Sequence, residues 1–166
     1  MKILVTGFAP FGGEKLNPSW EAVKRLPDRI GGAELIKREL PTEFVASGTM
    51  LHGLLERLRP DAVLCVGQYG GANGVHVERV AVNLRDARIA DNAGRQPTDE
   101  PVVTGGPDAY FATIPTRRIV DALRERDIPA RLSYSAGTFV CNDLLYCALH
   151  ESAQGYPAMR CGFIHV

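Results

Sequence analysis

The sequence predicts an α/β domain built around a mostly parallel sheet. Short apolar runs typical of strands alternate along the chain with segments of helical periodicity. Residues 62–66 form an uninterrupted apolar run before a glycine-rich loop, which is the pattern of a strand buried on both faces. No repeat, low-complexity tract or linker divides the 166 residues, so we expect a single domain spanning residues 1–166.

In the first half of the chain, strand and helix signals come in turn. Residues 2–6 form a short apolar strand, and weak alternation over residues 34–40 predicts another. Asn17-Pro18 predicts a helix start, because Asn is a favoured N-cap and Pro suits the first helical position. A second helix is expected to end at about Arg59, before Pro60. The leucines that give it helical spacing are Leu51, Leu54, Leu55 and Leu58.

The second half of the chain continues this alternation. Residues 84–113 are rich in Asp, Asn, Gly and Pro and predict long connections. The other predicted elements are a strand at residues 75–83, a helix at 116–126, a strand at 130–134, a helix at 140–151 and a final strand at 159–166. In sheets of this kind, ligand sites collect at the carboxyl ends of the strands.

Composition and charge exclude several classes of function. Nineteen basic residues balance nineteen acidic ones, whereas nucleic-acid-binding domains carry a basic excess, so no nucleic-acid partner is expected. No run approaches the roughly 18 apolar residues that span a bilayer. The opening MKILVTG is too short for a signal-peptide core, so we expect a cytoplasmic protein without a membrane partner. The cysteines lack metal-site spacing and are expected to be free thiols: Cys65, Cys141, Cys147 and Cys161.

Two glycine-rich loops follow predicted strands. The first, GFAPFGG, is neither a P-loop nor a dinucleotide-binding motif. Its Phe8 and Phe11 either fill the edge of the core or line a pocket for a small, flat, uncharged group. The second, GQYGG, is either a surface turn or a ligand loop in which Gln68 offers amide hydrogen bonds. A phosphate cradle is disfavoured there because no helix start follows the loop.

Cys141 is placed by SAGTFVCND in the first turn of a predicted helix. The partial positive charge of a helix N-terminus favours a thiolate, and its backbone N–H groups can hold an oxyanion. The sequence supports a second interpretation equally, because Cys141 shares helical spacing with Leu144, Leu145 and Ala148 and could be an ordinary core residue. The other three cysteines lie within predicted strands or a helix and are interpreted as structural.

A cysteine nucleophile needs a base, and the base needs a group that orients it. His165, at the end of the last predicted strand, is the best partner for Cys141, and Glu78 is a candidate orienter. Each also has a structural interpretation. His165 could be a hydrogen-bonded histidine of the last strand without a catalytic role, and Glu78 could be a solvated or salt-bridged strand carboxylate. His76 is interpreted as a strand surface residue, and His150 as a cap at a helix C-terminus.

At this point the motifs resemble those of a known family, pyroglutamyl-peptidase I, also called pyrrolidone-carboxylate peptidase. They span nearly the whole chain in the family's order and spacing, so their combination is highly specific. They are TGFAPFGG (6–13), NPSWEAVK (17–24), GQYGG (67–71), ERVAVN (78–83), DARIADNAGRQP (86–97), SAGTFVCN (135–142) and GFIHV (162–166).

The resemblance implies a cysteine peptidase that removes an N-terminal pyroglutamyl residue from peptides. It implies a three-layer α/β/α sandwich, no metal or organic cofactor, and a homo-oligomer, often a tetramer. By motif, Cys141 resembles the nucleophile, His165 the general base and acid, and Glu78 the third member of the triad, while Arg88 matches an arginine close to the active site. The residues that resemble those around the lactam ring are Phe8, Phe11 and Phe139 as its walls and Asn17, Gln68 and Val140 as polar or backbone contacts.

The chemistry of this substrate suits these residue types. Pyroglutamate has no free α-amine and its ring is a neutral lactam, so a pocket needs apolar walls and a few amide hydrogen bonds. A site that pairs the lactam carbonyl rejects proline, because each unpaired buried polar group costs about 1–3 kcal/mol. The expected reaction is attack by the Cys141 thiolate, with helix N–H groups holding the oxyanion and His165 first protonating the leaving amine and then activating water.

Three features depart from the family pattern. Tyr69 stands where a small residue is usual, so we expect a narrower pocket rim, and Ala72 replaces a common arginine that would anchor the loop. The sequence ends at Val166, whereas family members continue with a loop and a long helix that covers the sheet and contributes to assembly. His165 is therefore expected to fray.

Two alternatives from other classes stay open. One is a catalytically impaired small-ligand-binding domain of the same fold. The other is a different cysteine acyl hydrolase, or a nucleoside-processing enzyme that uses the Gly67 loop for phosphate. Turnover of a pyroglutamyl amide that is lost in Cys141→Ala and His165→Ala supports the peptidase, whereas a well-folded protein without turnover supports the binding domain.

Overall fold

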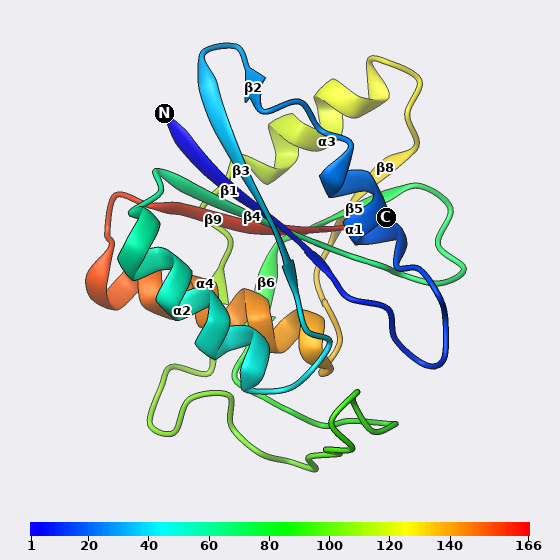
Figure 1. Ribbon diagram of the computed structural model, residues 1–166, viewed down its shortest axis with the longest axis vertical. Coiled ribbons are helices and arrows are strands. Elements are labelled where there is room, and N and C mark those ends of the chain that lie inside the picture. The colour runs from blue at the N-terminus through cyan, green and yellow to red at the C-terminus, as the bar shows by residue number, and fades with distance from the viewer.

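The computed structural model describes residues 1–166, arranged as a central sheet with helices on both faces (Figure 1). The strands are β1 (Lys2–Phe8), β2 (Arg29–Ile30), β3 (Ala33–Leu40), β4 (Ala62–Gly67), β5 (Val75–Glu78), β6 (Val80–Val82), β7 (Ala109–Phe111), β8 (Ala130–Ser133) and β9 (Arg160–His165). The helices are α1 (Pro18–Lys24), α2 (Ala46–Leu58), α3 (Thr116–Arg124) and α4 (Val140–Gly155). The α/β class and the mostly parallel sheet are confirmed.

The main sheet has seven strands in the order β2-β3-β1-β4-β9-β5-β8. The four central strands β3, β1, β4 and β9 are parallel to one another. β5 runs antiparallel to β9 and parallel to β8, and the short β2 is antiparallel to β3. The carboxyl ends of β1, β4 and β9 therefore meet at one edge of the sheet, where a site is expected.

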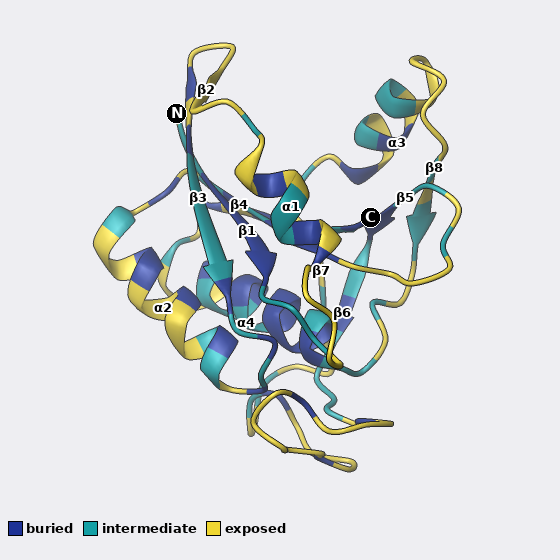
Figure 2. Ribbon diagram, turned by 45° about the vertical axis from the view of Figure 1, so that its right-hand side comes forward, coloured by how far each residue is buried: buried dark blue, intermediate teal, exposed yellow.

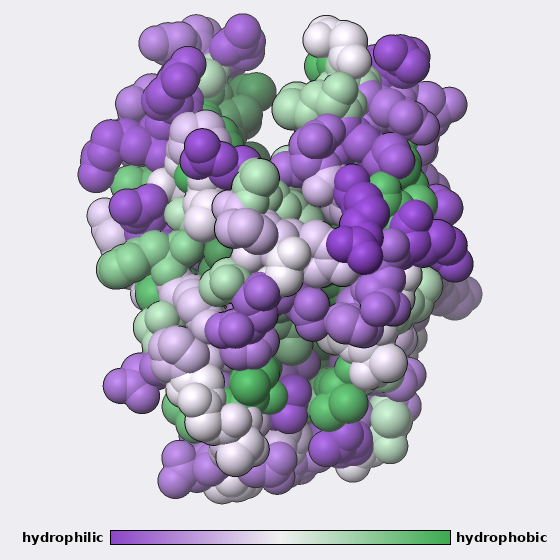
Figure 3. All heavy atoms as spheres, turned by 90° about the vertical axis from the view of Figure 1, so that its left-hand side faces the viewer, coloured by the Kyte–Doolittle hydropathy of each residue, from purple (hydrophilic) through white to green (hydrophobic).

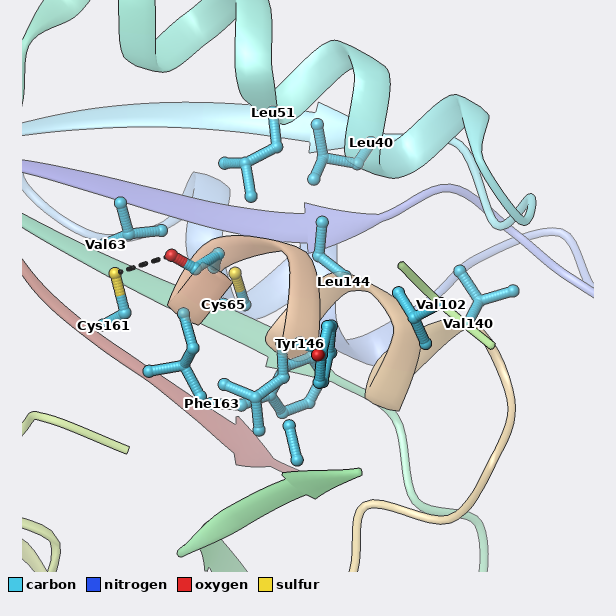
Figure 4. Close-up of a cluster of buried hydrophobic side chains, with 14 of the residues drawn as sticks. Leu40, Leu51, Val63, Cys65, Val102, Val140, Leu144, Tyr146, Cys161 and Phe163 are labelled. Atoms are coloured by element: carbon cyan, nitrogen blue, oxygen red, sulfur yellow. Dashed lines mark hydrogen bonds between the residues drawn. The ribbon is translucent and has the colours of Figure 1, made fainter. Parts of the chain in front are cut away.

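The two faces of the sheet differ in the number of buried apolar residues packed against them. α2 and α4 lie on one face, and α1 and α3 lie on the other (Figures 1 and 2). A cluster of 21 buried residues lies under α2 and α4, with Tyr146, Leu144 and Phe163 among its members (Figure 4). The other face holds a cluster of four buried residues, Val5, Val23, Leu35 and Val66. The side of the molecule in Figure 3 is mostly hydrophilic, with scattered apolar side chains.

α1 begins where the sequence predicts, because Asn17 caps it. The Asn17 side chain accepts a hydrogen bond from the backbone N–H of Ser19 at 3.0 Å, and Pro18 takes the first helical position. The helix packs closely on β1 at Gly7, where an added Cβ would lie 2.6 Å from Trp20 Cα. A glycine at this point of β1 lets the helix approach the sheet.

One predicted strand is wrong. Residues 75–83 are not a single strand, because the chain passes from the main sheet to a two-stranded sheet of β6 and β7 at Arg79. The Arg79 backbone N–H donates to Ser133 O at 2.8 Å, while its carbonyl accepts from Ala112 N at 3.0 Å, so this residue pairs with a different sheet on each side. β7 also lies within residues 84–113, which the sequence predicts as connections.

Two histidines lie in surroundings that differ from those predicted. His76 is not on the strand surface but is buried at 2% exposure, because β5 is covered by neighbours on both edges and by the Tyr69 ring. His150 does not cap a helix end, because α4 continues to Gly155 and the His150 ring pairs with the Tyr110 hydroxyl at 3.0 Å. No helix has the length and apolar character needed to cross a membrane.

Candidate active site

A cavity of about 880 Å³ opens where β1, β4 and β9 end and α4 begins. It is lined by 20 residues that come from distant parts of the sequence. Nine of them are predicted site residues: Phe8, Phe11, Asn17, Gln68, Glu78, Arg88, Phe139, Cys141 and His165. Val140 is the one predicted site residue whose side chain lies elsewhere, fully buried in the main core.

Cys141 is in the first turn of α4 and lines the cavity. Its sulfur lies over the end of β4, where a Cβ added to Gly67 would be 3.1 Å from Cys141 Sγ and 2.6 Å from the Phe163 ring. Gly67 therefore leaves the space that the sulfur and the ring occupy. The core interpretation of Cys141 is only partly right, because the residue packs beside the main cluster yet remains partly exposed.

Burial acts on the Cys141 thiol against the thiolate that the helix N-terminus is expected to favour. Burial raises the pKa of the Cys141 thiol to about 12, and the negative charge of Glu78 acts in the same direction. Burial therefore opposes ionisation of this thiol, and nucleophilic chemistry requires a neighbouring group that takes its proton.

His165 and Glu78 form a buried pair at the side of the cavity. His165 Nδ1 lies 2.7 Å from Glu78 Oε1, and the two residues are 6% and 1% exposed. An Nδ1–H that donates to the carboxylate leaves His165 Nε2 free to accept a proton. Glu78 is thus a buried carboxylate paired with His165, and not the solvated carboxylate of the structural interpretation.

Strand pairing explains why these side chains share one face of the sheet. β5 and β9 pair with His76 opposite His165, and alternate residues of a strand point to the same face. His76 and Glu78 therefore lie on the same face as His165. Phe163, two residues before His165, belongs to the main core, so this is the face that α4 covers.

The backbone around His165 is held from both sides. β9 lies between β4 and β5, the Val166 N–H donates to Gly67 O at 2.9 Å, and the Tyr69 N–H donates to Val166 O at 3.0 Å. The expectation of fraying at His165 is therefore wrong, because this residue belongs to an interior strand with hydrogen bonds on both of its edges.

Aromatic rings form the opposite end of the cavity. The Phe139 ring lies 5.3 Å from the Phe11 ring and 5.1 Å from the Phe44 ring, measured between centroids. Phe8, at the end of β1, is 2% exposed. Asn17 also lines this end, but its amide already caps α1 and donates to Ala9 O at 3.0 Å. Phe8, Phe11 and Phe139, which the family resemblance implies around the lactam ring, all line this cavity.

The long loop that carries Arg88 is pinned beside the cavity. The Thr138 hydroxyl donates to Asp86 O at 2.7 Å, and the Asp86 N–H donates to Thr138 O at 3.1 Å. Further along, Asp91 accepts the Phe44 N–H at 2.7 Å, and Asn92 donates to Pro10 O at 2.8 Å. These bonds place the exposed Arg88 side chain at the cavity wall.

The sequence analysis missed two residues that hold the start of α4. Asn142 accepts a hydrogen bond from Val82 N at 3.0 Å and donates to Val82 O at 2.9 Å, so the helix is tied to β6. The fully buried Asp143 pairs with Arg85, although burial raises the pKa of this carboxyl against the opposing effect of the arginine. The only sequence signal was their place directly after Cys141 in the SAGTFVCND motif.

Tyr69, which the sequence analysis expected at the pocket rim, lies beside His165, and so does His76, which the sequence analysis did not connect with the site. Tyr69 lines the cavity and is 51% exposed, and its ring lies 5.1 Å from the His76 ring and 5.7 Å from the His165 ring. His76 Nε2 accepts a hydrogen bond from Arg131 at 2.9 Å. Burial lowers the pKa of His76, and the Arg131 charge adds to this effect.

The remaining cysteines lie outside the cavity. Cys65 and Cys161 are fully buried, and Cys147 is on the middle of α4. Burial raises the pKa of each thiol to about 12, as it does for Cys141, so these cysteines differ from Cys141 in lying outside the cavity and not in the direction of the shift.

Known proteins of one family match this chain over its whole length. The sequence profile of the family described as "Pyroglutamyl peptidase" matches residues 1–166. A pyrrolidone-carboxylate peptidase from Thermococcus onnurineus is 54% identical over 166 residues, which is all of this chain and 83% of that protein. A second, from Chromobacterium violaceum, is 56% identical over 165 residues, or 99% of this chain and 76% of that protein.

Solved structures agree with these matches. The crystal structure of pyroglutamyl peptidase I from Bacillus amyloliquefaciens superposes with a TM-score of 0.97 at 48% identity, covering 99% of this chain and 81% of that chain. A mutant pyrrolidone carboxyl peptidase from Pyrococcus furiosus gives a TM-score of 0.96 at 48% identity, covering all of this chain and 80% of that chain.

Proposed function

The chain belongs to the pyroglutamyl peptidase family, a family of cysteine peptidases, and from this premise we propose that Cys141, His165 and Glu78 act as its catalytic triad. The reaction is hydrolysis of the amide bond that follows an N-terminal pyroglutamyl residue of a peptide, through an acyl-enzyme. One observation carries the proposal: the His165–Glu78 pair opens into the same cavity as the Cys141 thiol.

The first step couples proton transfer to attack. Because burial opposes ionisation of the Cys141 thiol, its proton moves to His165 Nε2 as the sulfur attacks the pyroglutamyl carbonyl carbon. Glu78 accepts the Nδ1–H and stabilises the imidazolium that forms. Arg88 and the backbone N–H groups in the first turn of α4 are the donors available to the developing oxyanion.

The second and third steps reuse the same histidine. His165 donates its proton to the leaving amine as the carbon–nitrogen bond breaks, which leaves a thioester on Cys141. His165 then takes a proton from a water molecule that attacks the thioester, and returns this proton to the sulfur as the acid is released. The charge of the buried pair is therefore restored at the end of each cycle.

The aromatic end of the cavity suits the acyl group of this substrate. Phe8, Phe11 and Phe139 offer apolar surface for a flat uncharged lactam, and the exposed Gln68 offers a donor and an acceptor for its N–H and C=O groups. A proline residue lacks this carbonyl, so a donor in the pocket stays unpaired, at a cost of about 1–3 kcal/mol.

Turnover of pyroglutamyl-7-amido-4-methylcoumarin tests the proposal directly. We expect hydrolysis by the wild type, and we expect no measurable hydrolysis by Cys141→Ala. Cys147→Ala is the matched control, because this thiol is on the same helix but outside the cavity, and it should retain turnover. Retained activity in Cys141→Ala, or a folded wild type without activity, would contradict the proposal.

A chemical test compares how readily an alkylating reagent reaches each of the four thiols. Iodoacetamide should label Cys141 before the fully buried Cys65 and Cys161, and a pyroglutamyl aldehyde that occupies the cavity should protect it. Mass spectrometry of the digested protein reports which thiol is modified. Equal labelling of all four cysteines would count against a reactive Cys141.

A further inference from the structure

We propose that Tyr69 sets the preference for the residue that follows the pyroglutamyl group, favouring a large aromatic or apolar side chain at that position. The inference rests on the proposed function and extends it from the acyl group to the leaving group. Tyr69 has no part in the bond-breaking steps described above. It is assigned here as a specificity-determining residue.

The order of the strands gives the cavity an acyl side and a leaving side. Phe8 ends β1, Gly67 under the Cys141 sulfur ends β4, and His165 ends β9, which is the next strand in the sheet. The acyl group lies toward the aromatic rings, on the β1 side of the sulfur. The leaving amine must lie within reach of His165, on the β9 side.

Tyr69 stands on this leaving side. Its ring centroid is 5.7 Å from that of His165, the residue that protonates the leaving nitrogen. The ring also contacts His76, which is opposite His165 in the pairing of β5 and β9. A side chain attached to the residue that carries the leaving nitrogen therefore extends toward the Tyr69 ring.

The Tyr69 ring is held in place before any substrate binds. Its backbone N–H donates to Val166 O at 3.0 Å, and its carbonyl accepts from Ala72 N at 3.2 Å in a tight turn. The ring meets His76 edge to face at 72°, and His76 is itself fixed by the hydrogen bond from Arg131. A surface that is already ordered loses little conformational freedom when a ligand packs on it.

The exposed part of the ring determines what it can recognise. Tyr69 lines the cavity and is 51% exposed. An aromatic face gains most from an aromatic or apolar side chain and offers glycine almost nothing. The resulting preference for phenylalanine over glycine, measured as a ratio of kcat/KM values, is expected to be about tenfold.

The test compares two substrates that share the acyl group, pyroglutamyl-Phe-amide and pyroglutamyl-Gly-amide. Product release is followed by liquid chromatography, and kcat/KM is measured for each. Tyr69→Ala should lower the Phe/Gly ratio of kcat/KM about tenfold, because it removes the ring. Tyr69→Phe should keep the ratio, and so should Phe111→Ala, which removes an exposed aromatic ring outside the cavity.

The outcomes separate this inference from the proposed function. Turnover with an unchanged ratio in Tyr69→Ala would overturn the inference alone. An equal loss on both substrates with a displaced pH profile would also overturn it, because Tyr69 would then act only through His165. A folded wild type that cleaves neither amide would overturn the proposed function and this inference with it.

Discussion

The two ends of the cavity differ in chemistry and in the elements that carry their side chains. The end near β1 is a group of aromatic rings, and two of them, Phe11 and Phe139, come from connecting segments. The other end holds the His165–Glu78 pair, and both residues are in strands of the main sheet. Under the proposed mechanism, connecting segments supply two of the substrate-binding rings, whereas strands of the main sheet supply the proton-transferring pair.

This division follows from what each task requires. A proton donor must stay within hydrogen-bond reach of its target, so small displacements cost activity. An apolar wall tolerates small displacements, because contact area changes gradually. We therefore expect substitutions at the His165–Glu78 end to lower kcat and substitutions at the aromatic end to raise KM.

The largest effect is expected for His165→Ala. Loss of the general base and acid should lower kcat by about 10⁴-fold, with a much smaller change in KM. Steady-state kinetics with the pyroglutamyl coumarin amide measure both constants. The variant also leaves Glu78 buried without its partner, so the double variant with Glu78→Gln should recover stability but no activity. A rise in KM with kcat unchanged would contradict the division between the two ends.

Glu78→Gln should have a smaller effect at the same end. The imidazole remains, but it loses the carboxylate that orients it and stabilises its charged form, so kcat should fall by about 10²-fold. KM should change little, since Glu78 does not contact the acyl pocket. Glu78→Asp, which keeps the charge on a shorter side chain, should retain more activity than Glu78→Gln. The reverse order would argue against an electrostatic role.

Phe139→Ala tests the aromatic end. Removing the central ring of this group should raise KM about tenfold and leave kcat nearly unchanged, because the lost contact exists in the ground state as well as in the transition state. The same coumarin substrate serves, with circular dichroism to check that α4 still forms. A loss confined to kcat would show that this ring acts on the chemical step instead.

The smallest effect concerns stability and pH. Burial lowers the pKa of His76 in the folded state. As the pH falls below about 6.5, His76 is therefore protonated in the unfolded chain before it is protonated in the folded chain. Stability contributed by neutral His76 is therefore present above this pH and is lost on acidification through the folded pKa.

Urea unfolding at pH 7.5 and pH 5.5 measures this contribution. The drop in unfolding free energy between the two pH values should be smaller in His76→Gln than in the wild type, because glutamine does not titrate. The comparison between the two proteins cancels the contributions of the other histidines. Identical drops would show that His76 is not the group responsible.

Much of the fold was predictable because its strongest signals are local. The apolar run that forms β4 and the Asn17-Pro18 start of α1 each depend on neighbouring residues only. The break at Arg79 was not predicted, because it depends on which sheet offers a hydrogen-bond partner to each side of one residue. The alternation does change phase there, between Val77 and Val80, and this shift was the available signal.

The site shows the same limit. Motifs identified Cys141, His165 and Glu78, but periodicity could not bring together residues separated by 87 positions, as His165 and Glu78 are. Residues that act by holding others, such as Asn142, carry no chemical signature of their own. The rise that burial causes in the pKa of Cys141 was not predicted, because the sequence shows the helix end but not the depth of burial.

The interior position of β9 has a consequence for motion during turnover. Freeing His165 would require separating β9 from both β4 and β5, an opening that costs nearly as much as global unfolding. In a deuterium-exchange experiment, the amides of this strand should therefore be among the slowest to exchange. Entry of a peptide and release of its products are therefore expected to leave the histidine in place.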